Sequence, residues 1–471
     1  METYNRNATE HARLGSAVCG MDAKEMSRWV ERLQTEYGDK LHNNRYQSVF
    51  RSFGMDGGDM LIGGLGRLAG MRISVSHTKI TGSLDLDGAV FYTEEDMPEA
   101  GFDSIPFEAV FSLCGRLREK LKSLIDPEFY CVPFLGGIKS VMLSEEPQEI
   151  VDYYLPELAL FGSGNRFRLF SAAHIPEHIP LEALPDSGKK KGFCRVKSRT
   201  ECPGKAEYVQ GMNHVLDELR QDTVQKVVVA RRCTITPEDS FHCCDYAAHL
   251  YDRYFQEYYF MFRQGEEAMW IGISPEIIMK QQGGRAVTKP LAGTRSKSED
   301  AAQNTKILQD LTSANKDIVE HEHALYFMVD QLQRAGIGEV KIDKNKTVLE
   351  TPYAFHIKSE ISMALKENVS CFDIIGAIYP PATIWGIPVD RTERLLAQTE
   401  PFDRGYYSGV YGYWNYEGIA DTALVIRSAK VENGAVSVYA GGGIVKLSNI
   451  DAEFDETVNK MGPLLSYFQE D

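Results

Sequence analysis

The spacing of apolar residues along the chain predicts a mixture of helices and strands. Apolar residues recur at helical spacing in four stretches, namely 23–37, 207–221, 301–335 and 451–468. Short apolar or β-branched runs predict strands at 71–75, 166–172, 224–235, 258–263, 268–273, 406–414, 422–431 and 436–439. Because helices and strands do not alternate strictly, the pattern favours an α+β fold with antiparallel sheets.

Local signals predict where some of these elements turn, break or begin. The strands 258–263 and 268–273 are separated by Gly265 and predict a hairpin. The third helical stretch is expected to break around 313–315, where a new helix can be capped. Asp451 is the expected N-cap of the last helix.

Residues 186–205 differ in composition from the rest of the chain. They are basic, contain glycine and have almost no apolar periodicity, which is typical of an exposed connection. We therefore divide the chain into residues 1–200, to which no function is assigned, and residues 201–471, in which the signals are denser.

Composition and charge narrow the classes of protein to which the chain can belong. Its 471 residues are 43% hydrophobic and 25% charged, as in folded proteins, and a net charge of −16 argues against a nucleic-acid binder. No run approaches the roughly 18–20 apolar residues of a membrane span, and residues 1–13 lack the apolar core of a signal peptide. The 9 cysteines include no Cys-x-x-Cys pair, so we expect reduced thiols in a cytoplasmic protein without membrane or nucleic-acid partners.

Two acidic clusters are candidates for a metal site. Asp317 and Glu320 lie three positions apart in one predicted helix, and Glu453, Glu456 and Lys460 share a face of another. Carboxylates from two helices suit Mg²⁺, a hard ion that prefers oxygen ligands. The same spacing is typical of solvated helix faces, so the pattern alone leaves both interpretations open.

Three charged residues lie next to apolar runs. Lys226 begins a predicted strand, where a lysine ordinarily reaches for water, but in a closed pocket desolvation would lower its pKa and let it act as a general base. Glu276, in Gly-Ile-Ser-Pro-Glu, is a candidate for the acid counterpart. Arg427, in Ile-Arg-Ser-Ala, is expected to meet a buried carboxylate of the protein or of a ligand.

The stretches 291–295 and 440–444 are rich in glycine. Backbone amides in such stretches can approach a carboxylate or phosphate closely. Neither stretch is a Walker A sequence or a dinucleotide fingerprint, so nucleotide binding has no specific support. Tight turns or bulges are the simpler interpretation.

Nine short motifs occur in one order between residues 207 and 465. They are Lys-Val-Val-Val-Ala-Arg, Ser-Pro-Glu, Leu-Ala-Gly-Thr-Arg, Lys-Asp-x-x-Glu-His, Gly-Ile-Pro, Arg-Gly-Tyr-Tyr-Ser-Gly, Ile-Arg-Ser-Ala, Ala-Gly-Gly-Gly-Ile and Glu-x-x-Glu-Thr-x-x-Lys. In this order they resemble the chorismate-utilising enzymes, which include isochorismate, salicylate, anthranilate and aminodeoxychorismate synthases. The resemblance implies one large α/β unit of two packed antiparallel sheets with helices outside, and chorismate as the substrate.

The resemblance also implies roles for individual residues. Mg²⁺ would be held by Glu320 and Glu456, with Asp317 and Glu453 supporting it through water, and would bind the ring carboxylate of chorismate. The residues implied to contact the rest of the substrate are Gly293, Thr294 and His356 at the ring, Tyr407, Arg427, Lys460, Gly441 and Gly443 at the enolpyruvyl carboxylate, and Thr383.

Within the family, a lysine at the position of Lys226 implies that water is the nucleophile. A neutral amine can deprotonate water attacking ring carbon 2, while Glu276 protonates the hydroxyl leaving carbon 4. The anthranilate and aminodeoxychorismate branches use ammonia and do not have this lysine. We therefore expect isochorismate to form first, by a monomer that needs no glutaminase subunit.

The positions that separate salicylate synthases from isochorismate synthases point both ways. Thr383, Tyr407 and Gly-Ile-Pro at 386–388 match salicylate synthases, whereas Val389 replaces their usual lysine and Ile426 is closer to isochorismate synthases. The sequence predicts a salicylate synthase that converts isochorismate onward to salicylate and pyruvate, since orienting the side chain suffices for that step. An isochorismate synthase is the alternative, followed by an aminating synthase and a non-catalytic chorismate-binding subunit.

Overall fold

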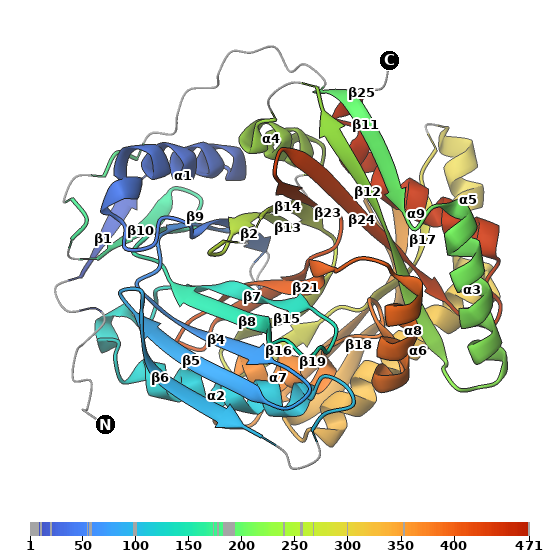
Figure 1. The fold of residues 1–471 in the computed structure, drawn as a ribbon, viewed down its shortest axis with the longest axis horizontal. Coiled ribbons are helices and arrows are strands. Elements are labelled where there is room, and N and C mark those ends of the chain that lie inside the picture. The colour runs from blue at the N-terminus through green and yellow to red at the C-terminus, as the bar shows by residue number, and fades with distance from the viewer. Residues whose placement is uncertain are drawn as a thin grey trace.

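The predicted α+β fold is confirmed by the computed structural model, in which two mostly antiparallel sheets face each other with helices around them (Figure 1). The structure describes residues 9, 12–18, 21–53, 55, 59–97, 101–172, 174–176, 179–181, 194–238, 241–254, 258–266, 268–298, 300–351 and 354–469. Among the helices in these ranges, none combines the length and the apolar surface that crossing a bilayer would require.

Each of the two sheets contains strands from both parts of the chain, in two adjoining blocks. Over the described residues, the larger sheet has the order β1 (Arg13–Val18), β10 (Arg166–Ser171), β9 (Leu158–Ser163), β3 (Asp59–Leu65), β2 (Gln47–Phe53), β13 (Tyr258–Arg263), β14 (Met269–Ser274), β23 (Ser428–Glu432), β24 (Ala435–Ile444), β12 (Lys226–Pro237), β11 (Cys194–Cys202) and β25 (Phe468–Gln469), with β20 (Gly386–Ile387) beside β12. The smaller sheet has the order β17 (Leu291–Ser296), β19 (Ala354–Leu365), β16 (Arg285–Thr288), β15 (Ile277–Gln282), β22 (Ala420–Leu424), β21 (Gly405–Trp414), β7 (Phe134–Ser140), β8 (Gln148–Leu155), β4 (Ala69–Val75), β5 (Ile80–Leu86) and β6 (Ala89–Asp96), with β18 (Gly338–Glu350) beside β19.

Helices cover the outer faces and one side of this pair of sheets (Figure 1). Their bounds are α1 (Ala23–Tyr37), α2 (Phe107–Lys122), α3 (Lys205–Arg220), α4 (Cys243–Tyr254), α5 (Ala301–Ser313), α6 (Asn315–Arg334), α7 (Cys371–Ile378), α8 (Val389–Thr399) and α9 (Ile450–Leu465). Helix α1 packs on β2 and β3 of the larger sheet, and α2 packs on β4 and β5 of the smaller one. Helix α6 contacts β17 and α9 contacts β24, so these two helices reach the end of the molecule where both sheets meet.

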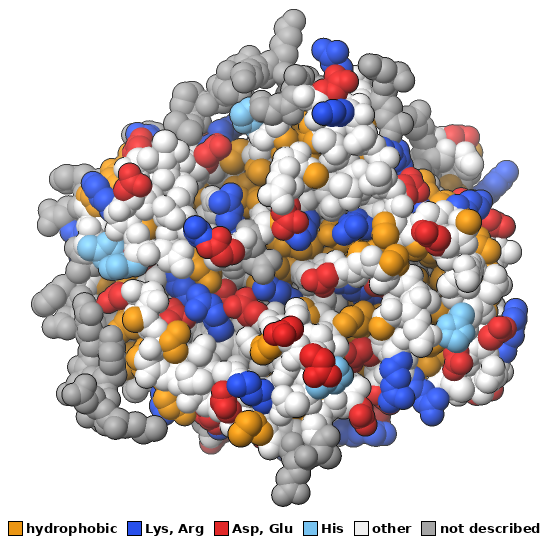
Figure 2. Space-filling view, in the orientation of Figure 1, with side chains coloured by type: hydrophobic (Ala, Val, Ile, Leu, Met, Phe, Trp, Pro, Cys, Tyr) orange, Lys and Arg blue, Asp and Glu red, His pale blue; other side chains and the backbone are white. Residues whose placement is uncertain are grey.

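The inner faces of the sheets share one apolar core. The rings of Phe262 on β13 and Tyr411 on β21 stack with centroids 3.6 Å apart, and Phe50 on β2 meets Tyr411 edge-on. Burial of such aromatic rings is the main favourable contribution to packing two sheets face to face. Residues 1–200 and residues 201–471 therefore contribute to the same core. On the surface seen in Figure 2, acidic and basic side chains are interspersed.

Several local predictions are confirmed and others are wrong. Helix α1 has the predicted bounds, the helical stretch 301–335 breaks at Ala314, and β13 and β14 form the predicted hairpin. The last helix begins one residue before Asp451, because the side chain of Asn449 accepts a hydrogen bond from the Ala452 amide and caps it.

The predicted exposed connection at 186–205 is wrong for part of its length. Residues 194–202 form β11, which pairs with β12 and is largely exposed, and residues 205 onward begin α3. Only residues 194 and 195 pair on the other side, with the two-residue β25, so over the rest of its length β11 is an edge strand of the described sheet, and natural proteins often keep such strands polar. Residues 186–193 of the predicted connection lie outside the described residues.

The chain crosses between the sheets twice at one place. Pro275 and Glu276 connect β14 of the larger sheet to β15 of the smaller one, and residues 425–427 connect β22 back to β23. The predicted single strand 422–431 is therefore wrong, because the chain leaves the smaller sheet after Leu424 and enters the larger one at Ser428, with Arg427 between them in a left-handed backbone conformation (φ 49°). The Leu424 amide donates to the Glu276 carbonyl at 3.0 Å, so the two crossings are joined to each other.

A buried ion pair between Arg404 and Glu400 holds the segment around Ile384 next to β12. Arg404 donates to the Glu400 carboxylate, with Nη2 and Oε1 2.6 Å apart. The same guanidinium donates to the carbonyl of Ile384 at 3.0 Å and to that of Val228 at 2.8 Å. Because removing one partner of a buried pair is costly, this contact fixes the segment that carries Thr383 beside β12.

Candidate active site

Most of the predicted site residues surround one cavity where the two sheets meet. The cavity contains about 630 Å³ of empty space, which includes space open to the solvent. The predicted residues in its wall are Glu276, Gly293, Thr294, Glu320, Thr383, Tyr407, Arg427, Gly441, Gly443 and Lys460. The other predicted residues are not part of the wall, namely Lys226, His356, Asp317, Glu453 and Glu456.

Lys226, the first residue of β12, is completely buried. Its Nζ lies 3.2 Å from Oε1 of Glu320 and makes no well-aligned hydrogen bond within the described residues. Burial lowers the pKa of the Lys226 ammonium below its ordinary value, although the attraction of Glu320 opposes the shift. Of the two interpretations of this lysine, the closed pocket applies, because the side chain does not reach water.

Glu276 is buried at the crossing between β14 and β15. The Leu291 amide donates to its Oε1 at 3.3 Å. Burial raises the pKa of Glu276 to about 8, although Thr383 and the Leu291 amide oppose the shift. At neutral pH the carboxyl therefore keeps its proton and is able to donate it.

Gly443 on β24 allows Lys226 and Glu320 to approach each other. A Cβ at this position would overlap the Glu320 carboxylate and would lie 3.0 Å from Cε of Lys226. The glycine-rich stretch 440–444 is strand rather than the expected turn, since Gly443 pairs with Val228 of β12. Glycine is needed at position 443 because the side chains of Lys226 and Glu320 occupy the space that a side chain there would fill.

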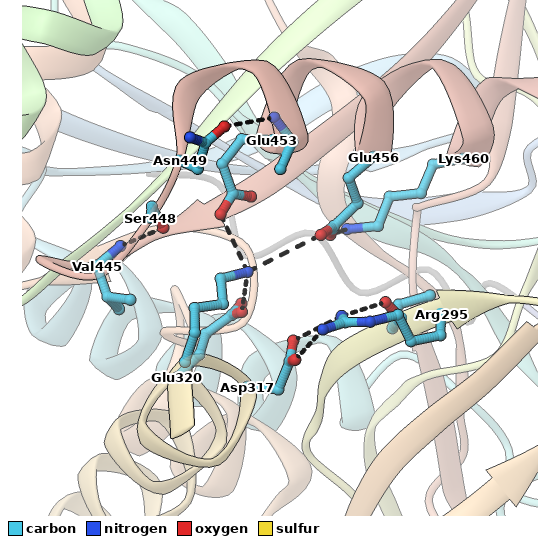
Figure 3. A network of polar contacts seen from close by, with 12 residues as sticks. Arg295, Asp317, Glu320, Val445, Ser448, Asn449, Glu453, Glu456 and Lys460 are labelled. Atoms are coloured by element: carbon cyan, nitrogen blue, oxygen red, sulfur yellow. Dashed lines mark hydrogen bonds and ion pairs between the residues drawn. The ribbon is translucent and has the colours of Figure 1, made fainter. Parts of the chain in front are cut away.

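Three glutamate carboxylates converge on the ammonium of Lys316. Its Nζ lies 3.1 Å from Glu320 Oε2, 3.2 Å from Glu453 Oε1 and 3.8 Å from Glu456 Oε2. Glu320 comes from α6 and the other two from α9, and Figure 3 shows their carboxylates directed to one centre. The two acidic clusters of the sequence therefore meet, and the solvated-face interpretation is wrong for these three residues. Lys316 begins the Lys-Asp-x-x-Glu-His motif, but its position among the three carboxylates was not predicted.

The charge on these carboxylates is set by the neighbouring lysines. Burial alone would raise the pKa of Glu320, but the ammonium groups of Lys316 and Lys226 outweigh it and hold that pKa at about 2. Lys460 and Lys316 likewise lower the pKa of Glu456. Burial raises the pKa of Glu453 to about 7 despite Lys316, and its Oε2 makes no well-aligned hydrogen bond.

This centre has the donor set of a hard divalent cation. It offers three carboxylates around one position, and at Glu453 an oxygen is left without a well-aligned hydrogen bond. Carboxylate oxygens from a few side chains, with water or substrate completing the shell, are how proteins hold Mg²⁺. The residues present therefore fit the metal that the sequence predicts, with Lys316 standing at the position that the ion would take.

Asp317 is directed away from this centre. Its two oxygens accept hydrogen bonds from Arg295 on β17, at 3.1 Å from Nη1 and 2.5 Å from Nη2 (Figure 3). A carboxylate held by both arms of a guanidinium is already compensated in charge and hydrogen bonding. The structure thus does not bring Asp317 to the position predicted for it, and it adds Arg295, which lies in the Leu-Ala-Gly-Thr-Arg motif but was not singled out.

Two cationic side chains and a tyrosine hydroxyl line the cavity next to the glycine-rich strand β24. Lys460 donates from Nζ to the Gly441 carbonyl at 2.8 Å, and Arg427 donates from Nη1 to the Lys460 carbonyl at 3.4 Å. The Tyr407 ring stacks on Tyr439 with centroids 5.1 Å apart. Burial raises the pKa of Tyr407 to about 12, so its hydroxyl stays protonated and is available as a donor.

His356 contacts the cavity wall through Thr294. The two residues face each other on the paired strands β19 and β17, with Nδ1 and Oγ1 2.9 Å apart. Burial lowers the pKa of His356 well below its ordinary value, so the ring is neutral. Its Nε2 has no hydrogen-bond partner within the described residues. The histidine therefore orients the Thr294 hydroxyl without adding charge.

Comparison with known sequences relates the chain to enzymes of chorismate. Residues 146–466 match the family model described as chorismate binding enzyme. The chain is 35% identical over 191 residues to anthranilate synthase component 1 of Pseudomonas aeruginosa, covering 40% of this chain and 39% of that one. It is 27% identical over 295 residues to the vibriobactin-specific isochorismate synthase of Vibrio cholerae, covering 62% of this chain and 74% of that one. The match thus spans about two fifths of the length of the anthranilate synthase.

The fold is also found in solved structures. The menaquinone-specific isochorismate synthase of Escherichia coli superimposes with a TM-score of 0.71 and 19% identity, covering 97% of this chain and 95% of that one. At that identity the likeness concerns the fold, whereas the family match spans most of the chain and every predicted site residue. This chain therefore belongs to the chorismate binding enzyme family.

Proposed function

We propose that this protein adds water to chorismate and thereby forms isochorismate. The observation that supports this most is the pair of buried groups Lys226 and Glu276, whose pKa values are shifted in opposite directions. The lowered pKa of Lys226 favours the neutral amine, and the raised pKa of Glu276 favours the protonated carboxyl. These are the forms that a general base and a general acid need at neutral pH.

In the proposed reaction, Lys226 accepts a proton from water while the water oxygen bonds to ring carbon 2. The electrons of both ring double bonds each shift by one position, so that the new double bonds join carbons 1 and 6 and carbons 4 and 5, and the bond between carbon 4 and its hydroxyl breaks. Glu276 gives its proton to that hydroxyl, which leaves as water. Substrate and product have the same composition, and the proton gained by Lys226 replaces the one lost by Glu276 through solvent before the next turnover.

Binding a substrate with two carboxylates requires local positive charge in a chain of net charge −16. Arg427 and Lys460 supply it in the cavity wall, and the Tyr407 hydroxyl is a further donor for the enolpyruvyl carboxylate. Glu320, Glu453 and Glu456 would hold Mg²⁺, which supplies charge for the ring carboxylate when it is bound.

Lys316 and a divalent cation compete for the same three carboxylates. The Lys316 ammonium lies within 3.8 Å of all three, so an ion bound to the same three carboxylates would be repelled by it. We propose that Lys316 holds the carboxylates together in the metal-free protein and leaves the centre when Mg²⁺ binds. A divalent ion replacing one ammonium adds one positive charge, which favours an anionic substrate.

Salicylate formation is the second candidate function. It is favoured by Thr383 and Tyr407, the two residues that match salicylate synthases, because both line the cavity. Expulsion of pyruvate from isochorismate moves a proton from carbon 2 to the enolpyruvyl methylene and breaks the ether bond, and it needs orientation more than acid or base. The same cavity would then carry out both steps.

Incubation with chorismate and Mg²⁺ is expected to give isochorismate, and Lys226→Met is expected to lower its rate by about 10²–10⁴-fold, because the general base is lost. Products are separated by liquid chromatography and identified by mass. Salicylate and pyruvate from the unsubstituted protein would establish the second candidate, and Lys226→Met should then still break down added isochorismate.

Lys280→Met is the matched control, because Lys280 is also a buried lysine, paired with Asp421 at 3.5 Å and outside the cavity wall. It is expected to keep its activity if circular dichroism shows it to be folded. Full activity in Lys226→Met, or incorporation of ammonia into the product of the unsubstituted protein, would contradict the proposed hydration.

The kcat/KM for isochorismate formation is expected to fall as the pH rises through about 8, where Glu276 loses the proton it must donate. It is also expected to fall toward acid pH, because Lys226 becomes protonated below its lowered pKa. The profile is measured at saturating Mg²⁺. A rate that is flat or still rises well above pH 8 would exclude Glu276 as the acid.

Lys316→Met is expected to bind Mg²⁺ about tenfold more tightly than the unsubstituted protein, because the competing ammonium is gone; this corresponds to about 1.4 kcal/mol. Isothermal titration with Mg²⁺ in the absence of substrate measures the affinity. Lys446→Met, which removes an exposed lysine paired with Asp222, should leave the affinity unchanged. Weaker or unchanged binding in Lys316→Met would show that Lys316 does not occupy the ion's position.

A further inference from the structure

We propose a second metal site, for Zn²⁺ or a similar first-row transition ion, formed by His42, Glu157 and His174. In the described residues, these three are the one group of histidine, cysteine, aspartate or glutamate side chains whose ligand atoms all lie within 4.8 Å of one another. His42 follows α1, Glu157 lies in the turn between β8 and β9, and His174 follows β10. None of the three lines the cavity of the candidate active site, so the proposal is independent of the proposed function.

The two imidazoles point to the same carboxylate oxygen. Nδ1 of His42 lies 3.1 Å from Glu157 Oε2, and Nε2 of His174 lies 2.5 Å from it. The rings are close to perpendicular, with centroids 4.2 Å apart, and neither makes another hydrogen bond in the described residues. Two nitrogens and a carboxylate oxygen are therefore already gathered around one point. Each nitrogen now donates a proton to Glu157, and binding of an ion would release that proton and expose the lone pair.

The surroundings of Glu157 leave its negative charge without a permanent counter-charge. Its side chain is fully buried, and its oxygens accept from the backbone amides of His42, Asn43 and Arg67 at 3.0–3.2 Å. Within the described residues, its only ion-pair partners are the two histidines. The guanidinium of Arg67 turns instead to Asp85. A buried carboxylate in this position is stabilised by a bound cation.

The backbone contacts fix the carboxylate before an ion arrives. The Glu157 amide donates to the Leu65 carbonyl at 3.0 Å, and its own carbonyl accepts from the Ala172 amide at 2.8 Å. The ligand is thus built into the larger sheet between β3 and β10, whereas the imidazoles are 38% and 30% exposed. An ion can therefore enter from the solvent and find one rigid and two adaptable ligands.

The ligand types select the ion. Imidazole nitrogen is a ligand of Zn²⁺ and other first-row transition ions, whereas Mg²⁺ prefers oxygen. Two histidines and one glutamate are a known Zn²⁺ donor set, with water in the fourth position. Bonds of about 2.0–2.1 Å in a tetrahedron place the ligand atoms roughly 3.3 Å apart. The present separations of 2.5 and 3.1 Å to Glu157 need to widen by less than about 1 Å.

An ion at this site would join three segments that are far apart in the sequence. It would tie the stretch after α1 and the stretch after β10 to the β8–β9 turn, at one end of the larger sheet. A ligand that binds the folded state and not the unfolded one raises the free energy of unfolding. The proposed role is therefore stabilisation of the part of the fold built by residues 1–200, rather than catalysis.

The test titrates the chelator-treated full-length protein with Zn²⁺ and, separately, with Co²⁺, both with Mg²⁺ in excess to occupy the carboxylate centre. One Co²⁺ per chain is expected to give the visible absorption bands of a tetrahedral nitrogen and oxygen site, and Zn²⁺ is expected to displace it and to raise the melting temperature. His42→Ala and His174→Ala should each weaken Zn²⁺ binding roughly tenfold or more, since even the loss of a supporting residue costs that much.

His214→Ala is the matched control, because His214 is an exposed histidine that contacts Gln398 on the other side of the fold. It is expected to bind Zn²⁺ with unchanged affinity. Absence of Zn²⁺ binding in the unsubstituted protein would overturn the proposal. Binding that is equally strong in His42→Ala and His174→Ala would also overturn it, because the ion would then be held by the cysteines or by the carboxylate centre.

Discussion

The structure depends on how charged side chains are balanced in the buried region where the two sheets meet. The completely buried Lys226 lies 3.2 Å from Glu320, and Lys316 and Lys460 approach the same group of carboxylates. Removing charges from water costs several kcal/mol for each ion, so such a cluster persists only when opposite charges nearly balance or when some groups give up their charge. Glu276 and Lys226 are among the groups for which burial favours the neutral form. The same balance explains how the neutral amine of Lys226 and the protonated carboxyl of Glu276 can both exist in this buried region.

The buried region between the sheets is formed where two neighbouring connections pass from one sheet to the other. The chain passes from the larger sheet to the smaller one at Glu276 and returns at Arg427, and the two crossings are hydrogen-bonded to each other. A crossing exposes side chains that a continuous strand would pack into its neighbours, so the cavity wall receives both an acid and a guanidinium there. Helices α6 and α9 then bring their carboxylates to the open side of the same cavity. Gly443 lies against both Glu320 of α6 and Lys226 of β12, and a side chain at this position would not fit.

Much of this arrangement follows from the sequence, and the part that does not has a clear reason. Lys226, Glu276 and the carboxylates of Glu320 and Glu456 can be found from short runs and helical spacing, because each depends on its own strand or helix. The position of Lys316 and the pairing of Asp317 with Arg295 depend on how α6 packs against α9 and β17, which no local spacing records. Arg427 was expected inside a strand because its neighbours are apolar, but those neighbours belong to two different sheets. The roles of the residues rest on the family resemblance rather than on spacing.

The pKa of Lys226 in the substrate-free protein tests the central claim most directly. It can be measured by nuclear magnetic resonance on full-length protein labelled in its lysine side chains, with the Lys226 signal assigned by its absence in Lys226→Arg. Burial next to a single carboxylate predicts a pKa below the ordinary 10.5, so that the neutral amine is present under conditions in which the protein is folded. A pKa at or above 10.5 would mean that Glu320 keeps the ammonium charged, and the account of Lys226 as a base would then be contradicted.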